Sequence, residues 1–302
     1  MEDKYKDILD NKKSCDYLNT NGEVEKCFEN VPDNVTVSLS GGVDSMVCLE
    51  ICKKLNKNIT AVHINYNNRE TSYQESFFVK EWCSSLGITL HVRNITEMTR
   101  NSIDREVYEE FTRVARFNEY RKVNLPVVLG HNRDDAFENI ITNINKHKII
   151  DNIVGMKLID TIDGVEIMRP MLNIPKSMII AYARANNIPF LYDSTPKWSQ
   201  RGKIRDNIIP AMKTFDVQLE LNMLNFAKDV SEIIKHIPVK DSYPREEIIN
   251  NETFWNHIIG GCKRGIIKEI MAKFEKGTNG TIPINTKRIV SFYETEISFL
   301  YV

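Results

Sequence analysis

The chain has 302 residues, of which 42% are hydrophobic and 27% charged, and its formal net charge is -1. This composition is typical of a globular protein with one large domain, or with one large and one small domain. No apolar run approaches the ~18 residues of a membrane-spanning helix, so we expect no membrane partner. The charged N-terminus lacks a signal-peptide core, which predicts a cytoplasmic protein. The near-neutral charge means that an RNA partner would need a local basic patch.

From residue 35 to about 190, short apolar runs alternate with longer amphipathic stretches. The apolar runs predict strands at 35–39, 59–64, 88–92, 126–129 and 164–168. The amphipathic stretches predict helices at 45–55, 72–86, 104–123, 134–145 and 175–186. This alternation predicts an α/β fold, a Rossmann-like parallel sheet covered on both faces. In such sheets, ligands bind at the carboxyl ends of the strands.

After about residue 215 the pattern changes. We expect helices at 217–237 and at 254–274, the second interrupted by Gly260 and Gly261. The stretch 277–283 is rich in turn residues, and 287–293 is predicted as a last short helix. The sequence therefore predicts three parts: an N-terminal helical extension (1–33), a central α/β domain (34–214) and a small, mainly helical C-terminal domain (215–302).

The loop that joins the first strand to the next helix has the sequence Ser40-Gly41-Gly42-Val43-Asp44-Ser45. Its two glycines let the backbone turn tightly and approach a ligand. Successive N–H groups and the helix N-terminus favour an anion, and Ser40 and Ser45 add hydroxyl donors. Asp44 cannot donate to a phosphate, so its natural partner is a metal ion carried by the phosphates. The loop is neither a Walker A loop nor a dinucleotide G-x-G-x-x-G.

This hexapeptide resembles the signature of the PP-loop ATP pyrophosphatases, which have an adenine nucleotide alpha hydrolase-like fold. Members cleave ATP between the α and β phosphates, adenylylate a substrate and release pyrophosphate. They include amide-forming synthetases, tRNA thiolases and tRNA(Ile)-lysidine synthetase. The resemblance implies ATP and Mg2+ as cofactors, with residues 40–45 on the nucleotide and Asp44 on the metal. The loop alone does not choose among the members.

Two further segments resemble the lysidine synthetase branch. His63 begins the stretch H-I-N-Y-N-N-R after the second strand, and Arg113 and Arg116 share a face of the helix 104–123. The resemblance implies that the strand carrying His63 meets the adenine. It also implies that both guanidinium groups bind phosphate, with Arg113 in a catalytic role. A solvated loop, and a surface ion pair between Glu109 and Arg113, are the structural alternatives.

Three carboxylates follow the fourth strand, at Asp134, Asp135 and Glu138. Gly130 permits a close approach of the backbone there, and the carboxylates crowd one side of the first helical turns. Capping of the helix alone would account for one or two of them. The stretch resembles the family motif G-H-x-x-D-D-x-x-E-T, with Asn139 in place of Thr. The resemblance implies that His131 contacts the cofactor and that the acidic cluster holds free lysine, with Asp135 and Glu138 as catalytic candidates.

Later segments extend the resemblance. Residues 168–172 match I-R-P-L-L, residues 188–196 resemble W-x-x-D-x-S-N, and residues 201–210 resemble R-N-x-L-R-x-x-x-x-P with Gly202 in place of Asn. Trp198 is a candidate stacking surface for a base. The candidate contacts to tRNA phosphates are Lys197, Arg201, Lys203 and Arg205. A solvated charged turn is the alternative.

The resemblance covers residues 34–212 and implies a tRNA(Ile)-lysidine synthetase-like ligase. Such an enzyme adenylylates an anticodon cytidine at C2, in tRNA(Ile) with a CAU anticodon, and lets lysine displace AMP. A thiolase is an alternative, although the six cysteines contain no C-x-x-C pair, which predicts reduced, partly buried thiols. An amide-forming synthetase and a non-catalytic ATP- or RNA-binding homologue are further alternatives. The oligomeric state stays open, a homodimer included.

Overall fold

The computed structural model describes residues 5, 9, 21–98, 103–145, 153–191, 200–235, 241–259, 264–285 and 288–301. The chain folds as two compact units, and each is described by itself. The first unit comprises Met1–Ala136 and Met156–Ile204, and the second unit comprises Phe137–Gly155 and Arg205–Val302. The three-part division expected from the sequence, with boundaries after residues 33 and 214, stays a prediction.

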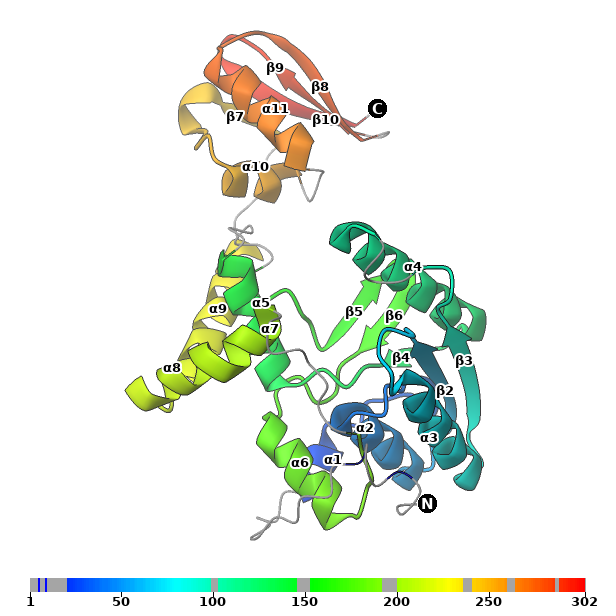
Figure 1. Cartoon of the computed structure of the whole chain (residues 1–302). Helices are drawn as coiled ribbons and strands as arrows, with labels where there is room; N and C mark the ends of the chain where they lie inside the picture. Colours follow the sequence, from blue (N-terminus) through cyan, green and yellow to red (C-terminus); the bar gives the residue numbers. More distant parts are fainter. Residues whose placement is uncertain are drawn as a thin grey trace. The chain divides into compact units, whose positions relative to one another are not determined.

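The first unit is built on a six-stranded sheet with the strand order β3-β2-β1-β4-β6-β5 (Figure 1). Five strands run parallel, and β5 pairs antiparallel with β6. The strands are Asn34–Ser38 (β1), Asn58–Asn65 (β2), Thr89–Asn94 (β3), Val127–Val128 (β4), Ile159–Ile162 (β5) and Val165–Met168 (β6). The predicted parallel-sheet α/β fold is confirmed, and β5 is an additional strand that the sequence pattern did not reveal.

Helices cover both faces of this sheet (Figure 1). They are Asn21–Lys26 (α1), Val43–Lys54 (α2), Ser72–Ser85 (α3), Arg105–Val123 (α4) and Lys176–Ala185 (α6). Two further helices, Arg133–Asn145 (α5) and Gln200–Lys203 (α7), contribute none of their described residues to the apolar clusters on the sheet, and α7 is followed by a π-helical turn at Ile204–Ile208. One apolar cluster joins α1, α2, α3 and α6 to one face, whereas α4 packs on the other face. The alternation of side chains along a strand makes this possible, because in β2 Ala61 faces the first cluster while Val62 and Ile64 face the second.

The helix ends follow local sequence rules. The side chain of Asp104 accepts a hydrogen bond from the N–H of Glu106 and so caps the start of α4. Helix α3 is followed by Gly87 at φ +69°, the left-handed conformation that glycine adopts readily after the end of a helix. None of the helices in the described part of the chain is long and apolar enough to cross a membrane.

The second unit contains a separate antiparallel sheet with the order β7-β10-β9-β8. Its strands are Ser242–Pro244 (β7), Gly280–Asn285 (β8), Arg288–Phe292 (β9) and Glu296–Tyr301 (β10). Its helices are Ile209–Phe215 (α8), Leu219–Lys235 (α9), Glu252–Ile259 (α10) and Arg264–Glu275 (α11), and the 3-10 turn is Arg245–Glu247. Trp255, fully buried, lies in the core between this sheet and α10 and α11.

Two sequence predictions for this region are corrected. The stretch predicted as a helix at 287–293 contains strand β9, and the predicted turn-rich stretch at 277–283 contains most of β8. The C-terminal part is therefore helical and sheet-forming rather than mainly helical. The physical reason lies in the residue types, since Ile289, Val290 and Phe292 are β-branched or aromatic and fit a pleated surface. In so short an apolar run, periodicity alone does not separate strand from helix.

Candidate active site

A cavity of about 390 Å³ lies in the first unit where strands β1, β4 and β6 end. It is lined by Ser38, Ser40, Asp44, Ser45, Arg113, Arg116, Phe117, Tyr120, Leu129, Gly130, His131, Asp135, Ile162 and Arg169. Its volume falls in the range of small-molecule sites, roughly 300–1,000 Å³. A second cavity of about 560 Å³ lies against α3 and β3 and contains none of the predicted site residues. The chemistry-bearing residues thus gather at the strand ends where a parallel sheet binds its ligands.

The loop 40–45 is closed by its own hydroxyl groups. The Oγ of Ser45 donates to the carbonyl of Gly42 at 2.9 Å and accepts from the N–H of Ser40 at 3.1 Å. Gly42 is the N-cap residue of α2 and offers no side-chain cap. The first N–H groups of α2 therefore receive no cap from it, which leaves the helix N-terminus suited to an anionic ligand.

Two glycines lie in close contact with other atoms at the loop. A Cβ atom at Gly130 would lie 2.8 Å from the carbonyl carbon of Asp44 and 2.9 Å from the nitrogen of Ser45. Gly41, at φ +87°, would place a Cβ 2.5 Å from Cδ1 of Leu191, whose own N–H donates to the Gly41 carbonyl at 2.9 Å. Neither position has room for a side chain, so glycine is required at both.

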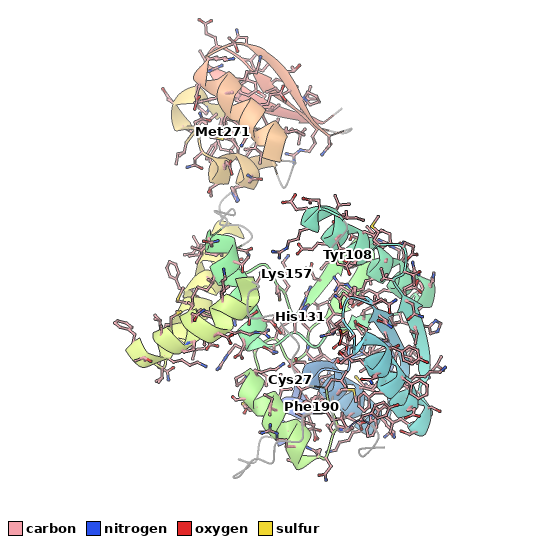
Figure 2. The ribbon with its side chains drawn as sticks, in the orientation of Figure 1. Cys27, Tyr108, His131, Lys157, Phe190 and Met271 are labelled. Atoms are coloured by element: carbon pink, nitrogen blue, oxygen red, sulfur yellow. The ribbon has the colours of Figure 1, made fainter. Side chains whose placement is uncertain are left out.

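Leu191 belongs to the stretch 188–196 that resembles the family pattern. It bridges in parallel to Gly42 and antiparallel to Leu9, so three separated segments meet at the loop. Phe190 packs in the same apolar cluster, against which Cys27 also packs (Figure 2). Residues 192–196 lie outside the described residues.

Asp44 is held by two partners. Nζ of Lys176, from the first turn of α6, forms an ion pair with its carboxylate, and Nδ2 of Asn132 donates to Oδ1 at 3.0 Å. Burial raises the pKa of the Asp44 carboxyl, as does the nearby Asp135, while Lys176 and Asn132 act to lower it. Two carboxylates, of Asp44 and Asp135, face the cavity, and one or two carboxylates beside substrate phosphates are the usual ligands of Mg2+.

The carboxylates of the acidic motif also have capping roles. Asn132 and Asp135 form a reciprocal capping box at the start of α5, with each side chain accepting the N–H of the other residue at 3.1 Å. Oδ2 of Asp134 accepts the N–H of Lys176 at 2.8 Å and so caps α6, whose N-cap residue Pro175 supplies no side-chain cap. The capping alternative thus applies to Asp134 and Asp135, and of these two only Asp135 also lines the cavity.

Glu138 lies one turn further along α5, in the second unit, and its side chain is only 1% exposed. It forms an ion pair with Arg205 of the same unit. Of the four predicted contacts to tRNA phosphates, Lys203 is exposed, Arg205 is bound to Glu138, and the side chain of Arg201 lies outside the described residues. Lys197 and Trp198 also lie outside them.

The predicted arginine pair on α4 lies in the wall of the cavity. Arg113 forms an ion pair with Asp163 at 2.6 Å and its guanidinium lies 4.6 Å from the ring centre of Phe117. Arg116 lies 5.9 Å from the same ring. The alternative ion pair between Glu109 and Arg113 is not formed, because Glu109 pairs with Arg105 at 2.7 Å.

His63 lies beside the loop but does not line the cavity. Its ring is 5% exposed, and Nδ1 lies 2.8 Å from the carbonyl oxygen of Leu39, the residue just before the loop. Burial lowers the pKa of His63, so the ring is held neutral and Nδ1–H donates to that carbonyl. The structure therefore shows His63 supporting the end of β1.

The sequence predicted no role in the site for three residues that the structure brings there: Asn132, Arg169 and Lys176. Arg169 was part of a matched segment, but nothing in its spacing indicated a role. Lys176 could have been noticed as a cation in the first turn of a helix, where the helix dipole disfavours it unless a carboxylate is near. Asn132 has the N-cap residue type, which gave no sign of its bond to Asp44.

The sequence of the chain matches a protein family model and the sequences of several known proteins. Residues 17–212 match the family model of the PP-loop domain. The chain is 28% identical over 225 residues to the tRNA(Ile)-lysidine synthase of Chlamydia abortus, which covers 73% of this chain and 71% of that protein. It is 34% identical over 199 residues to the tRNA(Ile)-lysidine synthase of Pseudothermotoga lettingae, which covers 62% of this chain and 43% of that protein.

Among solved structures, a U34-tRNA thiolase from Methanococcus maripaludis with its [4Fe-4S] cluster has a TM-score of 0.57. It is 18% identical and the match covers 73% of this chain and 80% of that one, so it shares the fold. The matched family model spans more than half of the chain and includes every residue that lines the cavity. The chain therefore belongs to the PP-loop domain family.

Proposed function

We propose that the chain is an ATP-dependent ligase of the tRNA(Ile)-lysidine synthetase kind, which works in the cytoplasm on its tRNA. The observation that carries this proposal is one cavity that unites the loop 40–45, the arginines Arg113 and Arg116, and Asp135 of the acidic motif. Membership of the PP-loop family supports the use of ATP. The relatives named tRNA(Ile)-lysidine synthase support the choice of tRNA as substrate.

The phosphates of ATP would bind the loop, where the hydroxyl of Ser40 and the first N–H groups of α2 are the donors. The hydroxyl of Ser45 would join them by giving up its hydrogen bond to the Gly42 carbonyl. Arg113 and Arg116 lie in the cavity wall and would stabilise negative charge on the phosphates. Phe117 and Tyr120 complete this wall, with the Tyr120 hydroxyl 2.7 Å from Oγ of Ser38.

A Mg2+ ion fits this cavity because Mg2+ is held by one or two carboxylates together with substrate phosphates. Asp44 is the proposed ligand, with Asp135 facing the same space. No group of three His, Cys, Asp or Glu side chains that could hold a metal by itself occurs in the described part of the chain. Bound there, the ion would neutralise phosphate charge. Lys176 balances Asp44 in the present structure and would give up that ion pair.

The reaction has two steps. O2 of the cytidine attacks the α-phosphorus, the bond to the β-phosphate oxygen breaks, and pyrophosphate leaves. The amine of lysine then attacks C2, the bond from C2 to the phosphate oxygen breaks, and AMP leaves. The lysine must first lose a proton, for which a carboxylate of the acidic motif is the proposed acceptor. Asp135, which lines the cavity, is the proposed acceptor, and the carboxylate of Glu138 is already ion-paired with Arg205.

The test is pyrophosphate release by the full chain with ATP, lysine and unmodified tRNA(Ile) bearing a CAU anticodon. We expect release that requires both the tRNA and lysine, and that is lost in Asp44→Asn. A tRNA with uridine in place of the anticodon cytidine is the matched control, and it should give no release. Intact ATP binding without any release from the CAU substrate would contradict the proposed substrate.

A further inference from the structure

Arg169 is a buried cation in the cavity wall that the reaction described so far does not use. It follows β6 directly, and its N–H donates to the carbonyl of Leu158 at 2.7 Å. The residue is 4% exposed, and yet its side chain lines the cavity. Arg169 is therefore a buried residue in the wall of the space where a ligand would bind.

The hydrogen bonds of this guanidinium go to neutral groups. Nε donates to Nδ1 of His131 at 3.1 Å, and Nη1 donates to the carbonyl of Lys157 at 2.8 Å. Figure 2 labels His131 and Lys157, which both lie in the first unit. Because Nδ1 of His131 accepts, the ring proton lies on Nε2. Nη2 has no partner among the described residues, so it is the part of Arg169 left for a ligand.

Two of the other cations near this cavity are balanced by carboxylates, and Arg116, a third cation in the wall, is already proposed to bind the phosphates. Arg113 has Asp163 as an ion-pair partner, and Lys176 has Asp44. Among the described residues, Arg169 has no carboxylate within ion-pair distance, and Asp160 acts on it only from farther away. Burial lowers the pKa of Arg169, although an arginine stays protonated in proteins. A buried charge without an opposite charge is unfavourable, so this position is suited to an anionic ligand.

The cavity thus contains two separate places for an anion. One is the loop 40–45, with its helix N-terminus, two hydroxyl groups and the metal-binding candidate Asp44. The other is Nη2 of Arg169, beside His131 at the ends of β4 and β6. Cleavage of ATP between the α and β phosphates produces two anions that must be held apart. The loop suits the more highly charged pyrophosphate with its metal ion, and the single guanidinium suits one phosphate group.

We propose that Arg169, oriented by His131, binds the α-phosphate of ATP, the phosphate that stays with the adenylylated substrate after pyrophosphate leaves. This assignment rests on the proposed function. Donors fixed before the reaction, in a site with little water, stabilise charge that develops at the α-phosphoryl oxygens. The same contact would hold the adenylylated intermediate while lysine attacks.

The experiment compares the binding of AMP and of inorganic pyrophosphate to the full chain by calorimetry, at one ionic strength and with Mg2+. Arg169→Gln removes the charge. We expect it to weaken AMP binding by roughly 10- to 100-fold, as for the loss of a hydrogen bond to a charged group. Pyrophosphate binding should change little. The matched control is Arg121→Gln, because Arg121 is also an arginine that donates to a backbone carbonyl, that of Asp163, but it is exposed and lies outside the cavity.

Arg169→Lys, which keeps the charge, covers the case in which Arg169→Gln does not fold. It should bind pyrophosphate as the wild type does and bind AMP with intermediate affinity. Equal weakening of both ligands by the Lys variant, or unchanged AMP binding in a folded Gln variant, would overturn the assignment of the α-phosphate. If the wild-type chain bound neither AMP nor ATP, the proposed function itself would fail, which separates the two results.

Discussion

The loop 40–45 and the core of the second unit are stabilised by different means. The loop is positioned by close contacts that leave no space for a Cβ at Gly130, which meets backbone atoms, or at Gly41, which has a positive φ and meets the side chain of Leu191. The core of the second unit is filled by large apolar side chains around Trp255, whose ring lies 5.9 Å from Phe274 and 6.3 Å from Phe292. The first arrangement depends on the position of single atoms, and the second on the volume of side chains. They should therefore respond differently to mutation.

The largest effect on stability is expected for Trp255→Ala. The side chain is fully buried, and Nε1 donates to Oδ1 of Asn250 at 2.7 Å, so its removal leaves a large cavity and an unpaired acceptor. We expect a loss of about 3–5 kcal/mol in the free energy of unfolding of the second unit. ATP binding by the first unit should persist. Thermal unfolding combined with ATP titration measures both, and loss of ATP binding together with the second unit would contradict the separation.

Gly130→Ala tests whether the loop 40–45 depends on the close approach of Gly130. A methyl group there would meet backbone atoms of Asp44 and Ser45, which cannot move aside as a flexible side chain could. We expect displacement of the loop and a loss of activity on the order of 100-fold.

Gly265→Ala, in α11 of the second unit, is the matched control because nothing lies within 4 Å of its added Cβ. It should leave ATP binding unchanged and raise the free energy of unfolding by up to about 1 kcal/mol, because alanine favours a helix over glycine. Equal activity of the two alanine variants would show that the close approach at Gly130 has no consequence.

A smaller effect is expected at Asn132, which both caps α5 and donates to Asp44. Asn132→Ala should cost about 1 kcal/mol of stability through the lost cap. Asn132→Ser keeps a capping oxygen but is too short to reach Asp44, so it should restore stability and not ATP affinity. If Ser restored both, the bond to Asp44 would have no role in binding.

The smallest effect is a dependence of stability on pH through His63. Its pKa is lowered in the folded chain, mainly by burial, from the ordinary value of 6.5. The unfolded chain therefore takes up the proton first, so the free energy of unfolding is highest above pH 6.5 and falls as the pH decreases towards the folded pKa. The slope contributed by this group is at most about 1.4 kcal/mol per pH unit.

His63→Asn removes the titrating ring and keeps an N–H donor near the position of Nδ1. Chemical denaturation at several pH values should give a flatter profile for this variant than for the wild type. Parallel profiles for the two proteins would show that His63 is not the group responsible.

The sequence predicted the cavity region better than the second unit. The reason is that the two regions are restricted by different means. Gly41, Gly130 and the residues of the loop are restricted by close backbone approach and by charge, and such restrictions are visible as residue types at fixed spacing. Strand β9 is restricted by packing alone, and Ile289 and Val290 fit a short helix by pattern as well as a strand. The long-range partners were also hidden, because no spacing relates Lys176 to Asp44 or Arg169 to His131.

We propose that this cavity activates a tRNA cytidine with ATP for attack by lysine. Nucleoside mass spectrometry of tRNA(Ile) with a CAU anticodon, incubated with the chain, ATP and lysine, tests it most directly. We predict a cytidine that carries lysine, formed together with AMP and pyrophosphate and absent when lysine is omitted. A sulfur-containing nucleoside, or unmodified cytidine despite ATP binding, would contradict the claim.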